Sequence, residues 1–138
     1  MTVKFVQGTL LTIFLISLVG CVGLVAWSFL NGEISGDSLE NLILKLFAAY
    51  SIYLSIVLVG IFSQTNGKAA KPAPPLPTYS AILLVVAWNL AIVGRVLAFS
   101  LISTTDTVES LDAFLQKVIP ASAFIVSGGL TYFFIKLK

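Results

Sequence analysis

The chain has no histidine and a single cysteine, Cys21, among its 138 residues. A disulfide needs two cysteines, and a structural zinc site draws its ligands from several Cys and His side chains, so neither can form within the chain. The sequence also lacks a glycine-rich phosphate loop, a Cys–His pair and a pair of carboxylates inside an apolar run. We therefore expect no enzymatic activity, no cofactor and no metal.

Charge is equally scarce. Charged residues make up 10% of the sequence and hydrophobic residues 58%, whereas soluble domains carry about 25% charged residues. About 20 apolar residues in a helix cross a bilayer, and four runs reach that length. The segments between them are too short for a soluble core, which usually needs about 50 residues. The sequence predicts an all-α membrane protein with four transmembrane helices, at 5–30, 38–63, 79–102 and 111–135.

A proline-rich segment separates the second and third spans, at 64–78. Proline removes backbone donors and breaks helices, so we expect an extended linker whose second half is not helical. Two uses remain open: a polyproline docking site for the aromatic groove of a cytoplasmic protein, or a stiff spacer that keeps two lysines near the lipid headgroups. The residues concerned are Lys68, Lys71, Pro72, Pro74, Pro75 and Pro77.

The two signs of charge lie on opposite sides of the predicted spans. The lysines of the inner side are Lys4, Lys68, Lys71, Lys136 and Lys138, and the acids of the other side are Glu33, Asp37, Glu40, Asp106, Glu109 and Asp112. Lysine-rich flanks stay in the cytoplasm. We therefore expect both termini inside and an acidic exterior, in a bacterial inner membrane.

An internal repeat appears when the sequence is shifted by 72 positions. Residues 37–46 then fall on 109–118, with an acid–Ser–Leu–acid cap and a lysine eight residues after its first acid in both, and residues 25–30 fall on 97–102. The chain thus divides into two tandem units of two helices, 1–63 and 79–138. Because each unit holds two spans, the units keep one orientation, and we expect a pseudo-two-fold axis along the membrane normal.

Arg95 is the ionisable residue that lies deepest in an apolar span. A charge there costs at least ~2.5 kcal/mol on insertion scales and marks a candidate functional site. Asn89 is a candidate partner, and Gly23, the repeat equivalent of Arg95, offers room for the guanidinium. The site is either a tether within or between chains, or part of a water-filled path.

A second candidate is an outer layer of charge around the repeat pair Lys45 and Lys117. These lysines and Arg95 place positive charge beneath an acidic mouth, which suits an anion or lipid phosphate. The alternative is that both lysines are interfacial charges close to acids. The acidic members are Asp37, Glu40, Glu109 and Asp112.

For function, the sequence favours a non-enzymatic membrane subunit, an oligomeric scaffold or sensor that recruits a cytoplasmic protein, as in bacterial defence and immunity systems. Small residues at packing intervals and the small interior of a four-helix bundle predict a homo-oligomer. Besides itself, its expected partners are membrane lipids and a cytoplasmic protein, with no nucleic acid. The alternative is an oligomeric pore lined by Arg95 and polar residues.

Overall fold

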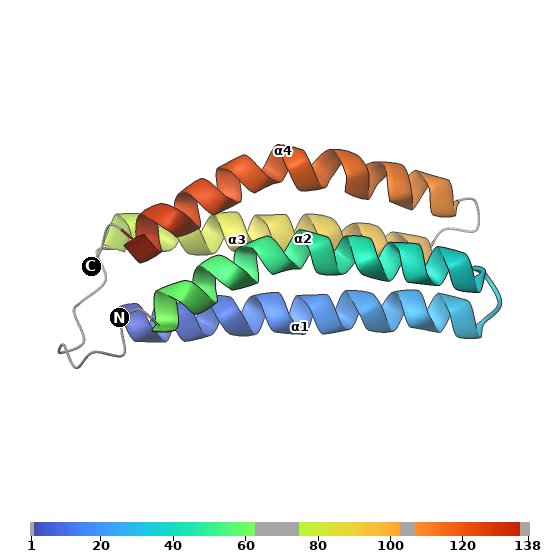
Figure 1. Cartoon of the computed structure of the whole chain (residues 1–138), viewed down its shortest axis with the longest axis horizontal. Coiled ribbons are helices and arrows are strands. Elements are labelled where there is room, and N and C mark those ends of the chain that lie inside the picture. The colour runs from blue at the N-terminus through green and yellow to red at the C-terminus, as the bar shows by residue number, and fades with distance from the viewer. Residues whose placement is uncertain (1, 63–74, 103–106, 136–138) are drawn as a thin grey trace.

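The computed structural model describes residues 2–62, 75–102 and 107–135. They form four long α-helices and one π-helical turn: α1 (Val3–Leu30), α2 (Gly36–Phe62), α3 (Pro75–Leu97), η1 (Ala98–Ile102) and α4 (Val108–Ile135) (Figure 1). Three stretches are long and apolar enough to cross a membrane, namely Phe5–Leu30, Gly36–Phe62 and Leu76–Leu101. The chain is therefore a helical, multi-pass membrane protein. A fourth crossing by α4, and the orientation, stay predictions.

Local sequence explains where the helices begin and end at the α1–α2 and α3–α4 connections. Gly32 ends the turn after α1 with φ of 75°, a conformation that favours glycine. The Ser35 hydroxyl then accepts a hydrogen bond from the Ser38 backbone N–H at 3.2 Å, which caps α2. Thr107 does the same for α4, accepting from the Ser110 backbone N–H at 3.3 Å. These caps stabilise the ends of the helices that carry the acidic residues.

Helix α3 begins at Pro75, four residues before the predicted span. Proline is tolerated in the first turn of a helix, because its missing N–H would have no intrahelical partner there. The expectation that the whole second half of the linker is non-helical is therefore wrong for residues 75–78. The other linker candidates, Lys68, Lys71, Pro72 and Pro74, lie outside the described residues.

The two hairpins stack side by side (Figure 1). Helix α1 packs against α2 and α3, and α4 packs against α2 and α3. A two-fold axis along the bundle would instead place α1 beside α4 and α2 beside α3, so the predicted two-fold relation is wrong. The equivalent helices of the two units are neighbours, α1 beside α3 and α2 beside α4, as when one hairpin is translated next to the other.

The buried faces of α2 and α4 agree with this arrangement. Leu42 and Leu46 are fully buried in α2, whereas α4 buries Leu111 and Leu115. In the 72-residue alignment Leu115 falls on position 43, so the buried face moves by one residue, about 100° around the helix. Such a quarter turn is expected because α2 meets its neighbouring hairpin on one flank and α4 meets it on the other.

Candidate functional sites

The centre of the bundle is filled by aromatic rings. Phe14 of α1 stacks on Tyr53 of α2 with ring centroids 5.5 Å apart and 7° between the planes. Trp88 of α3 meets Tyr50 and Tyr53 edge-on, at 4.9 and 4.7 Å. All four side chains are at most 5% exposed. The cluster therefore joins three helices and occupies the middle of the bundle.

Polar atoms within this core lack hydrogen-bond partners in the described part of the chain: Tyr50 Oη, Tyr53 Oη and Asn89 Oδ1. Cys21 lies beside the Tyr50 hydroxyl and Ser122 beside that of Tyr53, without hydrogen-bond geometry. A buried polar group without a partner costs about 1–3 kcal/mol. The aromatic cluster thus holds polar groups at a stability cost.

A hydrogen-bonded relay connects this cluster to α4. The Trp88 indole N–H donates to the Ser122 hydroxyl at 2.6 Å. Ser122 in turn donates to the backbone carbonyl of Val118 at 2.5 Å. Because serine in a helix readily bonds back to the preceding turn, Ser122 can present its oxygen lone pairs to the indole. The relay fixes Trp88 against α4.

Arg95 lies in the last turn of α3 and is partly exposed. Its guanidinium donates a hydrogen bond to the Ser110 hydroxyl in α4. The same group lies 5.8 Å from the centroid of the Phe114 ring, within the range of a cation–π interaction. Arg95 therefore ties α3 to α4 within one hairpin.

The structure does not bring the predicted Arg95, Asn89 and Gly23 together. Asn89 is buried and donates from Nδ2 to the Val85 carbonyl of its own helix at 2.8 Å. Gly23 is exposed, and a Cβ added there would meet nothing within 4 Å. The space beside Gly23 does not hold the guanidinium, because Arg95 turns toward α4.

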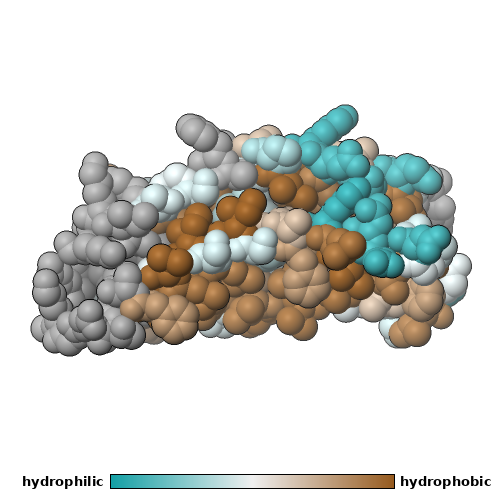
Figure 2. Space-filling view, in the orientation of Figure 1, coloured by the Kyte–Doolittle hydropathy of each residue, from teal (hydrophilic) through white to brown (hydrophobic). Residues whose placement is uncertain are grey.

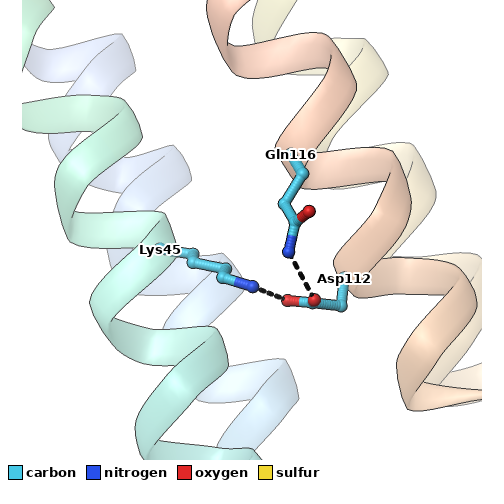
Figure 3. A network of polar contacts seen from close by, with 3 residues as sticks. All are labelled: Lys45, Asp112 and Gln116. Carbon is cyan, nitrogen blue, oxygen red and sulfur yellow. Dashed lines mark hydrogen bonds and ion pairs between the residues drawn. The ribbon is translucent and has the colours of Figure 1, made fainter.

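The outer charged layer is organised around Asp112 (Figure 3). Lys45 of α2 forms an ion pair with Asp112 of α4, and Gln116 donates to the other carboxylate oxygen at 2.8 Å. The Lys45 and Asp112 side chains are 25% and 21% exposed. This contact joins the two hairpins.

The other predicted members of that layer, Lys117, Asp37, Glu40 and Glu109, are exposed. Hydrophilic residues gather over the half of the bundle where α2 and α4 begin, and the other described residues on this face are mostly apolar (Figure 2). At the start of α4, the backbone N–H of Glu109 and the Thr107 hydroxyl hold the pKa of the Glu109 carboxyl below its usual value. Negative charge at a helix N-terminus is favourable.

Sequence reasoning missed the aromatic cluster. Trp and Tyr side chains usually gather at the two membrane–water interfaces, whereas Tyr50, Tyr53 and Trp88 stand in the interior of their spans. Their position in the middle of the spans was the feature of the sequence that could have indicated the cluster. Which of the rings meet could not be read from the sequence, because it depends on the order of the helices around the bundle.

Comparison of the chain with protein-family models, with curated proteins and with solved structures gives no significant match.

Proposed function

We propose that this protein is a non-enzymatic, oligomeric subunit of a bacterial inner membrane that recruits a cytoplasmic protein. The observation that supports it best is the aromatic core: Phe14, Tyr50, Tyr53 and Trp88 pack against one another where the axis of the bundle passes. A packed core argues against an aqueous path through one chain, since protein interiors reach crystal-like density. The bundle is better suited to holding other molecules than to conducting ions.

The pore alternative has weaker support. It needs Arg95 and polar residues along one continuous path. Arg95 contacts Ser110 and Phe114 in α4, whereas Asn89 bonds the backbone of its own helix inside the core. Two polar groups engaged with different elements do not form the lining of one channel.

We expect the cytoplasmic protein to bind at the end of the bundle where α2 ends and α3 begins. The two helices flank the proline-rich segment, and the first described turn of α1 lies at the same end (Figure 1). In the proposed orientation this end is cytoplasmic, because the lysines of the chain concentrate there. A polyproline segment between two anchored helices is presented at low entropic cost to an aromatic groove.

The test is native mass spectrometry of the affinity-purified protein from mild detergent. We expect a defined oligomer that carries a soluble protein. Replacing the prolines at 72 and 74 by serine, which leaves helix α3 intact, should release that protein and leave the oligomer number unchanged. A matched variant, Lys68→Gln with Lys71→Gln, keeps the prolines and should retain the partner if proline docking is the recruiting interaction.

Two results would oppose the proposal. If the wild-type oligomer carries no soluble protein, or if the proline variant keeps it, recruitment through the linker is wrong. A bare oligomer would then be reconstituted in planar bilayers, where ion currents that Arg95→Leu alters would favour the pore.

A further inference from the structure

The ion pair between Lys45 and Asp112 has a repeat equivalent, Lys117 with Glu40, that does not form within one chain. Lys45 falls on Lys117 in the 72-residue alignment, and Asp112 falls on Glu40. The first hairpin thus reaches the second through a lysine of α2 and an acid of α4. The second hairpin carries the same lysine, and the first carries the same acid.

Lys117 and Glu40 point away from the internal interface. Lys117 follows Asp112 by five residues, which is ~140° around the helix, so it faces away from α2. Glu40 precedes Lys45 by five residues and by the same reasoning faces away from α4. Both side chains are exposed, and among the described residues neither has an ion-pair partner.

We propose that the α3–α4 edge of one copy docks on the α1–α2 edge of a second copy, and that Lys117 of the first pairs with Glu40 of the second. This contact repeats between chains the packing by which α3–α4 lies on α1–α2 within a chain. It is heterologous, with different surfaces on the two sides, so it closes into a ring or extends into a row. The inference rests on the oligomeric part of the proposed function and specifies how the copies meet.

The α4 side of this docking edge carries small side chains. Ala121 and Gly128 follow Lys117 by four and eleven residues and therefore share its face. Both are exposed, and a Cβ added at Gly128 would meet nothing within 4 Å. Small residues allow close helix approach in lipid.

On α3 the flank next to α4 is marked by Leu84, which lies against Gly129, and by Arg95, which bonds Ser110. Ala87 and Ala91 lie one turn from these two residues and are exposed. The receiving edge carries larger side chains. Phe47 is two turns after Glu40 on the same face of α2 and is 50% exposed.

Charge complementarity carries the inference, because apolar and small residues occur on most lipid-facing helices. Lys117 and Glu40 are both exposed, carry opposite charges and lie on the outer flanks of the two hairpins. A partner copy would cover both and supply each with its counterion. The geometry of that pairing is already present in the chain, at Lys45 and Asp112.

Charge reversal tests the pairing. Lys117→Glu places two carboxylates opposite each other, and we expect it to weaken assembly in detergent by roughly tenfold or more, since like charges at an interface are strongly unfavourable. Glu40→Lys should do the same. The double variant restores opposite charges and should recover most of the wild-type assembly. If the single variants assemble as the wild type does, or if the double variant assembles no better than they do, the pairing is wrong.

Cysteine cross-linking tests the direction of docking. In a Cys21→Ala background, one tagged copy carries Lys117→Cys and a differently tagged copy carries Glu40→Cys, and a short bis-maleimide is added. We expect cross-links between the two tags, and few between two copies of Lys117→Cys. Matched controls are Asn41→Cys and Gln116→Cys, which are exposed and lie one residue, about 100° around the helix, from Glu40 and Lys117.

The outcomes separate this inference from the proposed function. Mixed cross-links well above the Asn41 and Gln116 controls support head-to-tail docking. An intact oligomer without them, or one dominated by Lys117–Lys117 cross-links, overturns head-to-tail docking and leaves the oligomeric subunit standing. A monomeric wild type overturns both.

Discussion

Asp112 shows how one side chain can set the position of a hairpin. A carboxylate in the second turn of α4 accepts from Lys45 on one oxygen and from Gln116 on the other (Figure 3). Gln116 is four residues along the same helix, so it orients the carboxylate toward α2. A lysine and an acid on separate helices can meet only if α2 and α4 are neighbours. Both residues were therefore predictable from the sequence, but their pairing was not.

A double-mutant cycle measures this contact. Lys45→Ala and Asp112→Ala should each lower the free energy of unfolding, with a coupling of about 1 kcal/mol, because both side chains are about a quarter exposed and partly screened. The measurement is reversible unfolding in detergent under conditions where the chain is monomeric. Lys117→Ala, its repeat equivalent, should show no coupling to Asp112→Ala. A coupling near zero for Lys45 and Asp112 would mean that the pair does not hold the hairpins.

Removing the Tyr53 hydroxyl should raise the free energy of unfolding rather than lower it. The hydroxyl is fully buried and has no hydrogen-bond partner in the described part of the chain. Tyr53→Phe removes the unsatisfied group and keeps the ring, so we expect unfolding to become harder by about 1 kcal/mol. Tyr53→Ala should cost about 3–5 kcal/mol through the cavity it leaves. Tyr79→Phe, at an exposed position, is the control, and a loss of stability in Tyr53→Phe would show that the hydroxyl is bonded.

Glu109 gives a prediction about pH. Its own backbone N–H and the Thr107 hydroxyl lower the pKa of its carboxyl in the folded state. A lowered pKa contributes stability at pH values above the unfolded pKa, and that contribution is lost as the pH falls through the folded pKa. Thr107→Val should raise the pKa of Glu109 toward its usual value in an NMR titration. An unchanged pKa would mean that the Thr107 hydroxyl does not bond the carboxylate.

The bounds of α2 and α4 agree with the sequence prediction more closely than those of α3 do. Hydropathy and the acidic caps located α2 and α4 to within a few residues. Helix α3 departs at both ends: it begins on prolines that read as linker, and it passes into the π-helical turn η1 at Ala98–Ile102. The second block of the repeat covers that turn, whereas the matching residues of α1 stay α-helical to Leu30. Similar apolar sequence therefore did not mean similar local structure.

Arg95 joins two helices, because its guanidinium contacts Ser110 and Phe114 of α4 from its place in α3. Arg95→Leu should lower the free energy of unfolding by about 1–2 kcal/mol, through loss of the Ser110 hydrogen bond and the Phe114 contact. Arg95→Lys keeps the charge and should be intermediate. Since both contacts lie inside one hairpin, the oligomer number should not change in native mass spectrometry. A change of oligomer number with unaltered unfolding would assign Arg95 to a contact between chains.

At the scale of the whole molecule, composition was enough to predict a helical membrane protein, because apolar length is a property of each segment alone. The order of the helices around the bundle was not predictable in the same way. Both a two-fold and a side-by-side arrangement keep the hairpins in the same orientation, and they differ only in which flanks meet. The packing of α1 on α3 and of α2 on α4 decides between them, and the choice depends on side-chain fit across all four helices.

The number of crossings can be settled with two cysteines in a Cys21→Ala background. Glu33→Cys lies in the connection between α1 and α2 and is exposed. In the proposed orientation it should react in intact cells with a membrane-impermeant maleimide. Lys138→Cys should react only after permeabilisation if α4 crosses the membrane, because four crossings return the chain to the side from which α1 starts.

If α4 does not cross, three crossings leave residue 138 on the same side as residue 33, and both cysteines react in intact cells. If the two cysteines are on opposite sides but only Lys138→Cys is labelled from outside, there are four spans and the orientation is reversed, which would place the proline-rich segment beyond the reach of a cytoplasmic partner.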